Sequence, residues 1–150
     1  MKPKHFILIL TLLTFIFGCS RYQFVKEIVF SENAPKPIGP YSQAVKVGKL
    51  VFLSGQIGIN PSDGSISPDV EKQFTQTMQN IENILKEANS DLTKVVKVTI
   101  YLKDLKDFDS INNLYSKYFT EKQPARETVE VSRLPRDAKI EISVIAISKK

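Results

Sequence analysis

The sequence of 150 residues contains one cysteine, one histidine and no tryptophan. A single cysteine excludes an intramolecular disulfide framework, and one cysteine with one histidine cannot build a zinc cluster. A Cys-His or Ser-His-Asp catalytic arrangement would need the histidine, which is His5 in an apolar N-terminal segment. General acid-base chemistry must therefore come from Asp, Glu, Lys or Tyr side chains, or from bound water.

Long hydrophobic runs are also missing, apart from the uncharged stretch FILILTLLTFIF at residues 6–17. As a helix these twelve residues would span about 18 Å, against a hydrocarbon core of about 30 Å. Lys2 and Lys4 precede the run and Gly18 follows it, an order typical of a signal peptide. We predict that residues 1–18 are a signal peptide and that residues 19–150 form a single domain.

Cys19 decides which kind of signal peptide is expected. The sequence Ile16-Phe17-Gly18-Cys19 resembles the lipobox of bacterial lipoproteins, although Phe17 stands where a small residue is usual. In a lipoprotein the cysteine thiol carries a diacylglyceryl group, and two acyl chains are enough for stable anchoring. We expect an exported protein that is lipid-anchored to a bacterial membrane, on the periplasmic or outer-surface side. An ordinary cleaved signal, or an uncleaved anchor, is the alternative.

The charge balance gives little sign of a polyanionic partner. The net charge of +5 would fall to +3 if Lys2 and Lys4 left with the signal peptide. Basic residues are scattered and alternate with acidic ones, as in Lys103-Asp104, rather than forming a stripe. We therefore predict a solvated surface and no nucleic-acid partner.

Hydrophobic periodicity separates helices from strands along the rest of the chain. Three- and four-residue spacing of apolar residues predicts amphipathic helices over residues 69–88 and 107–119. Alternation and β-branched residues predict strands over residues 22–30, 44–47, 50–54 and 95–102, with Gly48-Lys49 as a tight turn. A final hairpin is expected from strands 128–134 and 139–148, with residues 135–138 as its turn.

This order of elements predicts an α+β fold with a mostly antiparallel sheet and two helices on one face. On the last strand, Ile140, Ile142, Val144 and Ala146 would point to the helices. The other face of that strand carries Glu141, Ser143, Ile145 and Ile147. Because exposing two isoleucines beside a carboxylate is costly, we expect a second copy of the chain to cover this face in a symmetric oligomer.

Several short segments, in this order, resemble the Rid (reactive intermediate deaminase) family. The segments are Glu32-Asn33-Ala34-Pro35, Ile38-Gly39-Pro40-Tyr41, Ser54-Gly55-Gln56-Ile57, Pro124-Ala125-Arg126, Arg133-Leu134-Pro135 and Lys139-Ile140-Glu141-Ile142. The resemblance implies a chorismate-mutase-like protomer, a homotrimer and ligand sites at the three subunit interfaces. It also implies a 2-iminobutanoate/2-iminopropanoate type of deaminase, which hydrolyses enamines and imines such as 2-aminoacrylate to 2-oxo acids and ammonia without a cofactor or metal.

The same resemblance implies roles for individual residues. Arg126 matches the arginine that binds the substrate carboxylate, a task suited to its planar, always charged guanidinium group. Glu141 matches the carboxylate that holds a water molecule near the imine carbon and exchanges protons with it. Tyr41 matches a tyrosine of the pocket wall and is grouped with these two as catalytic. The further substrate-binding positions are Ser54, Gly55 and Thr128.

The expected register of the final hairpin separates the two charged residues. If Leu134 lies opposite Lys139, then Arg126 faces Ile147, which is six residues from Glu141, or roughly 20 Å along the sheet. The two side chains could not then hold one ligand within a single chain. We therefore expect each site to combine Arg126 of one subunit with Glu141 of its neighbour.

One departure from the family pattern bears directly on Arg126. Glu127 follows it where the family usually has a small neutral residue. A carboxylate there would either neutralise the arginine or, through strand alternation, point away from it. We expect an imine deaminase; the alternatives are an envelope-tethered trimeric protein that binds small carboxylates without turnover and a structural protein that keeps only the fold.

Overall fold

The computed structural model describes residues 25–149. Its helices are α1 (Val70–Glu87) and α2 (Phe108–Tyr118). Its strands are β1 (Lys26–Val29), β2 (Ala44–Val47), β3 (Leu50–Leu53), β4 (Gln56–Ile57), β5 (Val95–Leu102), β6 (Ala125–Glu130) and β7 (Ile140–Ile147). The predicted signal peptide and Cys19 lie outside the described residues. Within them, no helix is both long enough and apolar enough to cross a membrane.

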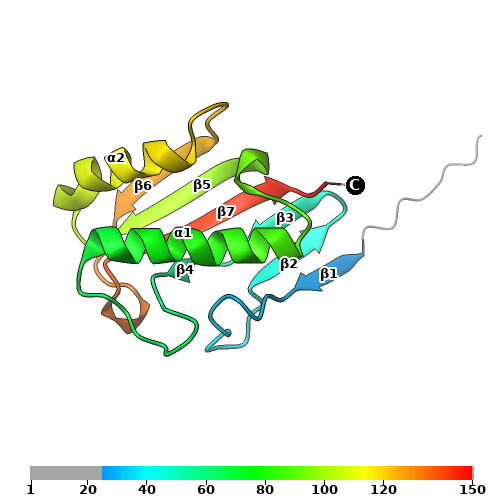
Figure 1. Cartoon of the computed structure of the whole chain (residues 1–150), viewed down its shortest axis with the longest axis horizontal. Coiled ribbons are helices and arrows are strands. Elements are labelled where there is room, and N and C mark those ends of the chain that lie inside the picture. Colours follow the sequence, from blue (N-terminus) through cyan, green and yellow to red (C-terminus); the bar gives the residue numbers. More distant parts are fainter. Residues whose placement is uncertain (1–24, 150) are drawn as a thin grey trace, which may run out of the picture.

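A single mixed sheet carries the whole fold. Its strands lie in the order β1-β2-β3-β7-β5-β6, with the short β4 beside β7. All pairs are antiparallel except β5 with β6, which run parallel. Both helices lie on one face of the sheet, α1 across its middle and α2 beside β6 (Figure 1). The predicted α+β class, the mostly antiparallel sheet and the two helices on one face are confirmed.

The α1 helix supplies the large side chains that cover the middle of the sheet. It begins after Asp69, whose carboxylate accepts a hydrogen bond from the backbone N–H of Lys72 at 2.9 Å, and it ends at Glu87, with Ala88 as its C-cap. Its apolar residues recur every three or four positions and are fully buried, as the periodicity predicted. The core residues at the interface between helix and sheet are Phe74, Met78, Ile81, Ile84, Leu85, Val98, Ile100, Ile142 and Val144.

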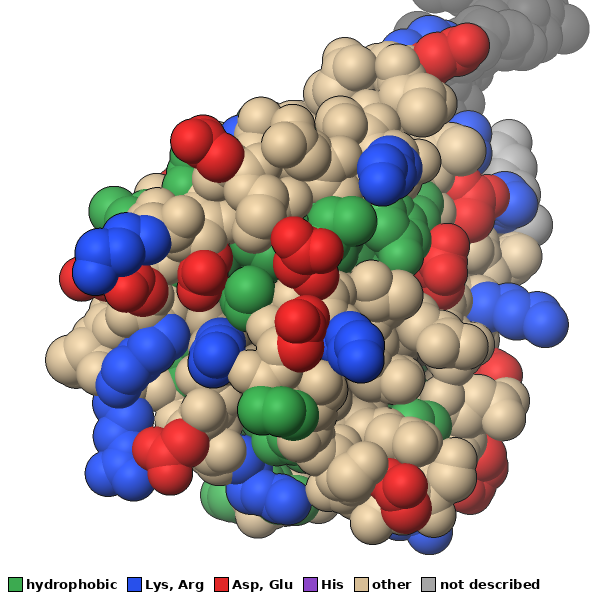
Figure 2. Space-filling view, turned by 60° about the vertical axis from the view of Figure 1, so that its left-hand side comes forward, with side chains coloured by type: hydrophobic (Ala, Val, Ile, Leu, Met, Phe, Trp, Pro, Cys, Tyr) green, Lys and Arg blue, Asp and Glu red, His purple; other side chains and the backbone are tan. Residues whose placement is uncertain are grey.

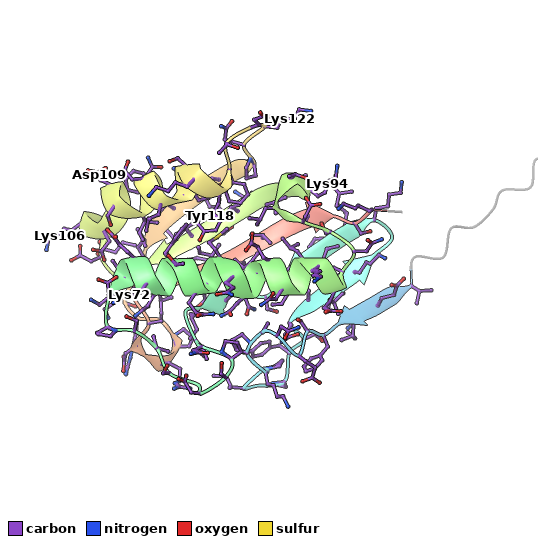
Figure 3. All side chains as sticks on the ribbon, in the orientation of Figure 1. Lys72, Lys94, Lys106, Asp109, Tyr118 and Lys122 are labelled. Atoms are coloured by element: carbon purple, nitrogen blue, oxygen red, sulfur yellow. The ribbon has the colours of Figure 1, made fainter. Side chains whose placement is uncertain are left out.

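The α2 helix packs beside α1 through aromatic side chains. Tyr118 lies between the two helices in Figure 3, and its ring meets that of Phe74 edge-on with centroids 5.6 Å apart. Lys106, Asp109 and Lys122, which are labelled in Figure 3, lie at the outer edge of the molecule on the side of α2. The aromatic side of α2 therefore faces inward, against α1 and β6.

The N-terminal part of the sheet follows the prediction with small changes of boundary. The turn at Gly48 has a φ of 60°, a left-handed conformation that glycine adopts without strain, and it joins β2 to β3 as expected. The first strand is shorter than the predicted 22–30, because β1 covers Lys26–Val29 and residues 22–24 lie outside the described part of the chain. The two-residue strand β4 was not predicted.

The predicted C-terminal hairpin is wrong. β6 covers Ala125–Glu130 and pairs with β5 in parallel, whereas β7 pairs with the opposite side of β5 and with β3. The physical reason is the connection through α2. A helix between two neighbouring strands returns the chain in its starting direction, so β6 must run parallel to β5. The expected pairings of Leu134 with Lys139 and of Arg126 with Ile147 therefore do not exist.

Candidate functional site

A cavity of about 260 Å³ opens where β4 and β7 meet the loop that precedes β2. Four of the six residues expected in the site line it: Tyr41, Ser54, Gly55 and Glu141. The remaining walls are largely apolar and include Pro35, Pro37, Ile38, Ile57, Ile59 and Pro135. A concave, mostly apolar pocket with a few convergent polar groups is the usual form of a small-molecule site.

Glu141 reaches into this cavity over a glycine. It lies on β7 opposite Ile57 of β4 and opposite Tyr101 of β5, so its side chain is on the face of the sheet away from the helices. A Cβ atom on Gly55 would overlap Oε1 of Glu141 and would lie 2.7 Å from its Cδ. The lack of a side chain at Gly55 is therefore what makes room for the carboxylate.

The Glu141 carboxylate has no partner among residues 25–149, since none of them forms a hydrogen bond or an ion pair with it. Burial, unopposed by any nearby cation, raises the pKa of Glu141 above its ordinary value. A carboxyl group whose pKa is raised toward neutrality exchanges protons more effectively at physiological pH. Both free oxygens can hold water or a ligand.

Tyr41 and Ser54 are fixed by the loop that borders the cavity. The Tyr41 hydroxyl accepts a long hydrogen bond, 3.4 Å, from the backbone N–H of Ile38, and the tyrosine side chain is exposed at the mouth. The Ser54 hydroxyl donates to the backbone oxygen of Ser42 at 2.7 Å. With its proton used in this bond, Ser54 presents lone pairs rather than a proton to the cavity.

Gln43, which the sequence did not predict as a site residue, holds the proline-rich loop of residues 35–40 in place. Its side chain, only 2% exposed, accepts from the backbone N–H of Ser31 at 2.6 Å and donates to the backbone oxygens of Ser31 and Pro35. A loop with three prolines has few backbone donors, so it needs an outside group to satisfy its carbonyls. The sequence shows only a glutamine directly before a short strand, which does not indicate the residues that it contacts.

Arg126 and Thr128 do not line the cavity. Arg126 lies on β6 opposite Val98, and Val98 in turn lies opposite Val144 of β7. Since Val144 and Glu141 are three residues apart on one strand, their side chains point to opposite faces of the sheet. Arg126 therefore points to the helix side and Glu141 to the open side. Thr128, two residues further along β6, shares the face of Arg126.

The separation of the two charged residues was thus expected, but the reasoning behind it was wrong. They are separated by two strand spacings and three residues of register, which places their Cα atoms about 14 Å apart, and not by six residues along one hairpin. They do not meet within one protomer.

Arg126 is held by aromatic rings instead of by an acid. Its Cζ atom lies 4.6 Å from the ring centroid of Tyr115 and 5.9 Å from that of Phe108, both on α2. Cations within about 6 Å of an aromatic face are attracted by the ring quadrupole. In the part of the chain that the structure describes, no carboxylate forms an ion pair with Arg126.

Glu127 points away from Arg126, as strand alternation allowed. Its carboxylate accepts a hydrogen bond from the Thr99 hydroxyl at 2.8 Å and forms an ion pair with Lys97 at 3.1 Å, on the open face of the sheet. Both groups lower the pKa of Glu127 below its ordinary value, and the hydrogen bond from Thr99 has the larger effect. The glutamate therefore does not neutralise Arg126 within the protomer.

If Arg126 binds a carboxylate, as the family resemblance implies, replacing Glu127 by glutamine should leave that binding almost unchanged. We expect the Kd of a small carboxylate such as pyruvate to change by less than about twofold, because the removed charge lies on the other face and already has partners. Isothermal titration of the variant measures this. A Kd that falls severalfold would mean that Glu127 does repel the ligand.

Comparison with known proteins shows the family to which the chain belongs. The family described as Endoribonuclease L-PSP matches residues 31–148. A RutC family protein of Pyrococcus abyssi is 56% identical over 122 residues, which cover 81% of this chain and 96% of that protein. The 2-iminobutanoate/2-iminopropanoate deaminase of Escherichia coli is 42% identical over 128 residues, covering 83% of this chain and 100% of the enzyme.

Solved structures of similar proteins have the same fold. The crystal structure of yeast YEO7 superposes with a TM-score of 0.81 at 39% identity and covers 83% of this chain and 100% of that chain. E. coli TdcF, solved with bound serine, gives a TM-score of 0.79 at 38% identity over 82% of this chain and 99% of that chain. The chain therefore belongs to the Endoribonuclease L-PSP family, which includes the Rid deaminases.

Proposed function

We propose that this protein is a 2-iminobutanoate/2-iminopropanoate type of deaminase, which hydrolyses 2-imino acids and their enamine tautomers to 2-oxo acids and ammonia. The observation that carries the proposal is Glu141: a half-buried carboxylate without a partner among the described residues, with a raised pKa, facing a cavity of small-molecule size. The names of similar proteins support it, among them Reactive Intermediate Deaminase A of Arabidopsis thaliana, 50% identical over 122 residues.

The proposed reaction needs one acid-base group and one anion-binding group. Glu141 accepts a proton from a bound water molecule while the water oxygen bonds to the imine carbon, and the C=N double bond becomes a single bond. The same carboxyl group then returns a proton to the nitrogen of the tetrahedral intermediate. A second proton then passes from the hydroxyl group of the intermediate, through the Glu141 carboxylate, to the amino group. The C–N bond breaks as the C=O bond forms, so ammonia leaves and the 2-oxo acid remains. Arg126 holds the substrate carboxylate throughout with paired N–H donors.

Because Glu141 and Arg126 face opposite sides of the sheet, we propose that the site is completed in a homotrimer, where Arg126 of one subunit meets the Glu141 cavity of the next. The open face of the sheet supports this assembly. It carries large apolar side chains that are between 39% and 56% exposed in the protomer, and a stable monomer rarely leaves such a row uncovered. These residues are Ile28, Phe52, Val129 and Ile147.

The direct test is release of a 2-oxo acid. Iminopropionate, generated in the cuvette, decays spontaneously to pyruvate, and the purified protein should accelerate that decay severalfold above the spontaneous rate. The Arg126→Ala variant serves as the control and should return the rate to the spontaneous value. A wild-type protein that leaves the decay unchanged would refute the deaminase proposal.

Binding of small carboxylates without turnover is the second candidate. The observation that favours it is the similar TdcF structure, which was solved with serine, a stable amino acid, as the bound molecule. Pyruvate binding that depends on Arg126, together with no acceleration of imine decay, would select this function.

We do not propose RNA cleavage, although the family description contains the word endoribonuclease. Figure 2 shows acidic and basic side chains interspersed over one face, rather than the continuous basic surface that phosphate backbones require. The single histidine of the chain, His5, lies before the family match.

We further propose that the chain is exported and held at a bacterial membrane by a lipid on Cys19. The support is the N-terminal sequence, with its basic start, its short apolar run and Ile16-Phe17-Gly18-Cys19. The family match begins only at residue 31, so it leaves this segment outside. Mass spectrometry of the mature N-terminus, with and without globomycin, tests the lipid directly; an unmodified Cys19 in untreated cells would refute it.

A further inference from the structure

We propose that Tyr115 is a positioning residue for Arg126: its ring fixes the guanidinium group while leaving the N–H donors free for a carboxylate ligand. This inference rests on the proposed function, because it assigns the carboxylate-binding task to Arg126. It concerns a residue on α2, a helix that contributes nothing to the lining of the Glu141 cavity.

The geometry places the cation over a ring that is itself rigid. Arg126 Cζ lies 4.6 Å from the Tyr115 centroid, nearer than the 5.9 Å to Phe108. Tyr115 is only 5% exposed, and its ring also packs against Phe119 with centroids 4.6 Å apart. A long arginine side chain on an edge strand would otherwise sample many rotamers. The ring therefore restricts the rotamers of Arg126 without neutralising its positive charge.

An aromatic ring suits this task better than an acid would. A carboxylate partner would occupy the same in-plane N–H groups that a substrate carboxylate needs. A ring face attracts the cation from above its plane and takes none of these donors. Arg126 has neither an ion pair nor a hydrogen bond with another described residue, which matches an arginine held ready for an outside anion.

The Tyr115 hydroxyl offers a clean way to separate the ring from the rest of the side chain. It is buried and has no hydrogen-bond partner among the residues that the structure describes. Removing an unpaired buried hydroxyl is close to neutral for stability. Tyr115→Phe keeps the ring face, whereas Tyr115→Leu keeps an apolar side chain and removes the ring. Phe108, which is 37% exposed, provides a second ring whose replacement by leucine spares the core.

The experiment measures binding of pyruvate and of its uncharged amide, pyruvamide, to the purified full chain by titration calorimetry. For Tyr115→Leu we expect pyruvate to bind about tenfold more weakly, because an arginine released from the ring must lose its rotamer freedom when it binds the ligand. Pyruvamide should bind with unchanged affinity. Tyr115→Phe should match the wild type, and Phe108→Leu should show a smaller loss for pyruvate than Tyr115→Leu, because its ring is farther from Cζ.

Each outcome has a definite meaning. Equal losses of pyruvate and pyruvamide affinity in Tyr115→Leu would mean that Tyr115 only supports the fold. Unchanged pyruvate binding in Tyr115→Leu would mean that the ring does not position Arg126. Either result overturns the inference. If Tyr115→Leu fails to fold, Tyr115→Met, which also lacks the ring but fills more of the buried space, takes its place, and unchanged pyruvate binding in that variant overturns the inference. If Arg126→Ala binds pyruvate as tightly as the wild type, the role of Arg126 in the proposed function fails first, and this failure is distinguishable from that of the inference about Tyr115.

Discussion

Replacing Glu141 by glutamine should lower the rate of imine hydrolysis by about 10²- to 10⁴-fold, the usual contribution of a positioned acid-base group. Glutamine has nearly the same shape and size, so it should still fit over Gly55 and leave the cavity intact. It cannot accept a proton from water and return one to the substrate nitrogen, because its amide group does not ionise. The measurement is the initial rate of pyruvate release at saturating imine, with pyruvate binding as the check that the site persists.

The same substitution should stabilise the fold at neutral pH. Burial raises the pKa of Glu141 in the folded state above its ordinary 4.5, so the ionised carboxylate is less favourable in the folded chain than in the unfolded one. That penalty is absent below the unfolded-state pKa of 4.5, grows as the pH rises from there toward the folded-state pKa, and is constant above it. The melting temperature of Glu141→Gln should therefore exceed that of the wild type at pH 7 and approach it at pH 4. A variant less stable at pH 7 would contradict the assignment.

Gly55→Ala should abolish activity through geometry alone. A Cβ at this position would overlap Oε1 of Glu141, so the carboxylate must leave its place in the cavity. Displacing a reacting group by about 1 Å costs on the order of 10²-fold in rate, and the added methyl group also narrows the pocket. We expect a folded protein with activity at least about 10²-fold below the wild type, measured by pyruvate release.

Gly64→Ala is the matched control for that variant. Gly64 has a φ of 72° and open space around its Cα, so alanine there strains the backbone without touching the cavity. It should cost about 1 kcal/mol of stability and leave the activity unchanged. If Gly55→Ala keeps its activity, or if Gly64→Ala loses it to the same degree, the carboxylate over Gly55 is not the reacting group.

The sequence was sufficient to predict those elements whose periodicity is long and regular. Burial of one face explains why α1 and β7 follow their predicted limits closely: apolar residues at helical or alternating spacing can face a core in only one way. The pairing partner of a strand could not be predicted in the same way. Alternation along β6 indicates a strand and its faces, but the neighbour it pairs with depends on the path of the chain through α2.

The candidate site likewise has residues that could be predicted from the sequence and residues that could not. Tyr41, Ser54, Gly55 and Glu141 come from segments that the family resemblance identified, and the structure brings these four together at one cavity. The supporting residues were not predicted. Gln43 and Tyr115 act through contacts between segments far apart in the sequence, with the proline-rich loop and with the edge strand, and no local pattern marks such contacts.

The most direct test of a site shared between subunits mixes two inactive variants, Arg126→Ala and Glu141→Gln, in equal amounts after dissociation and reassembly. If each site takes Arg126 from one subunit and Glu141 from the next, random mixing rebuilds about a quarter of the sites, and activity should return to that fraction of the wild type. If both residues act within one chain, the mixture stays as inactive as its components, and the shared site is refuted.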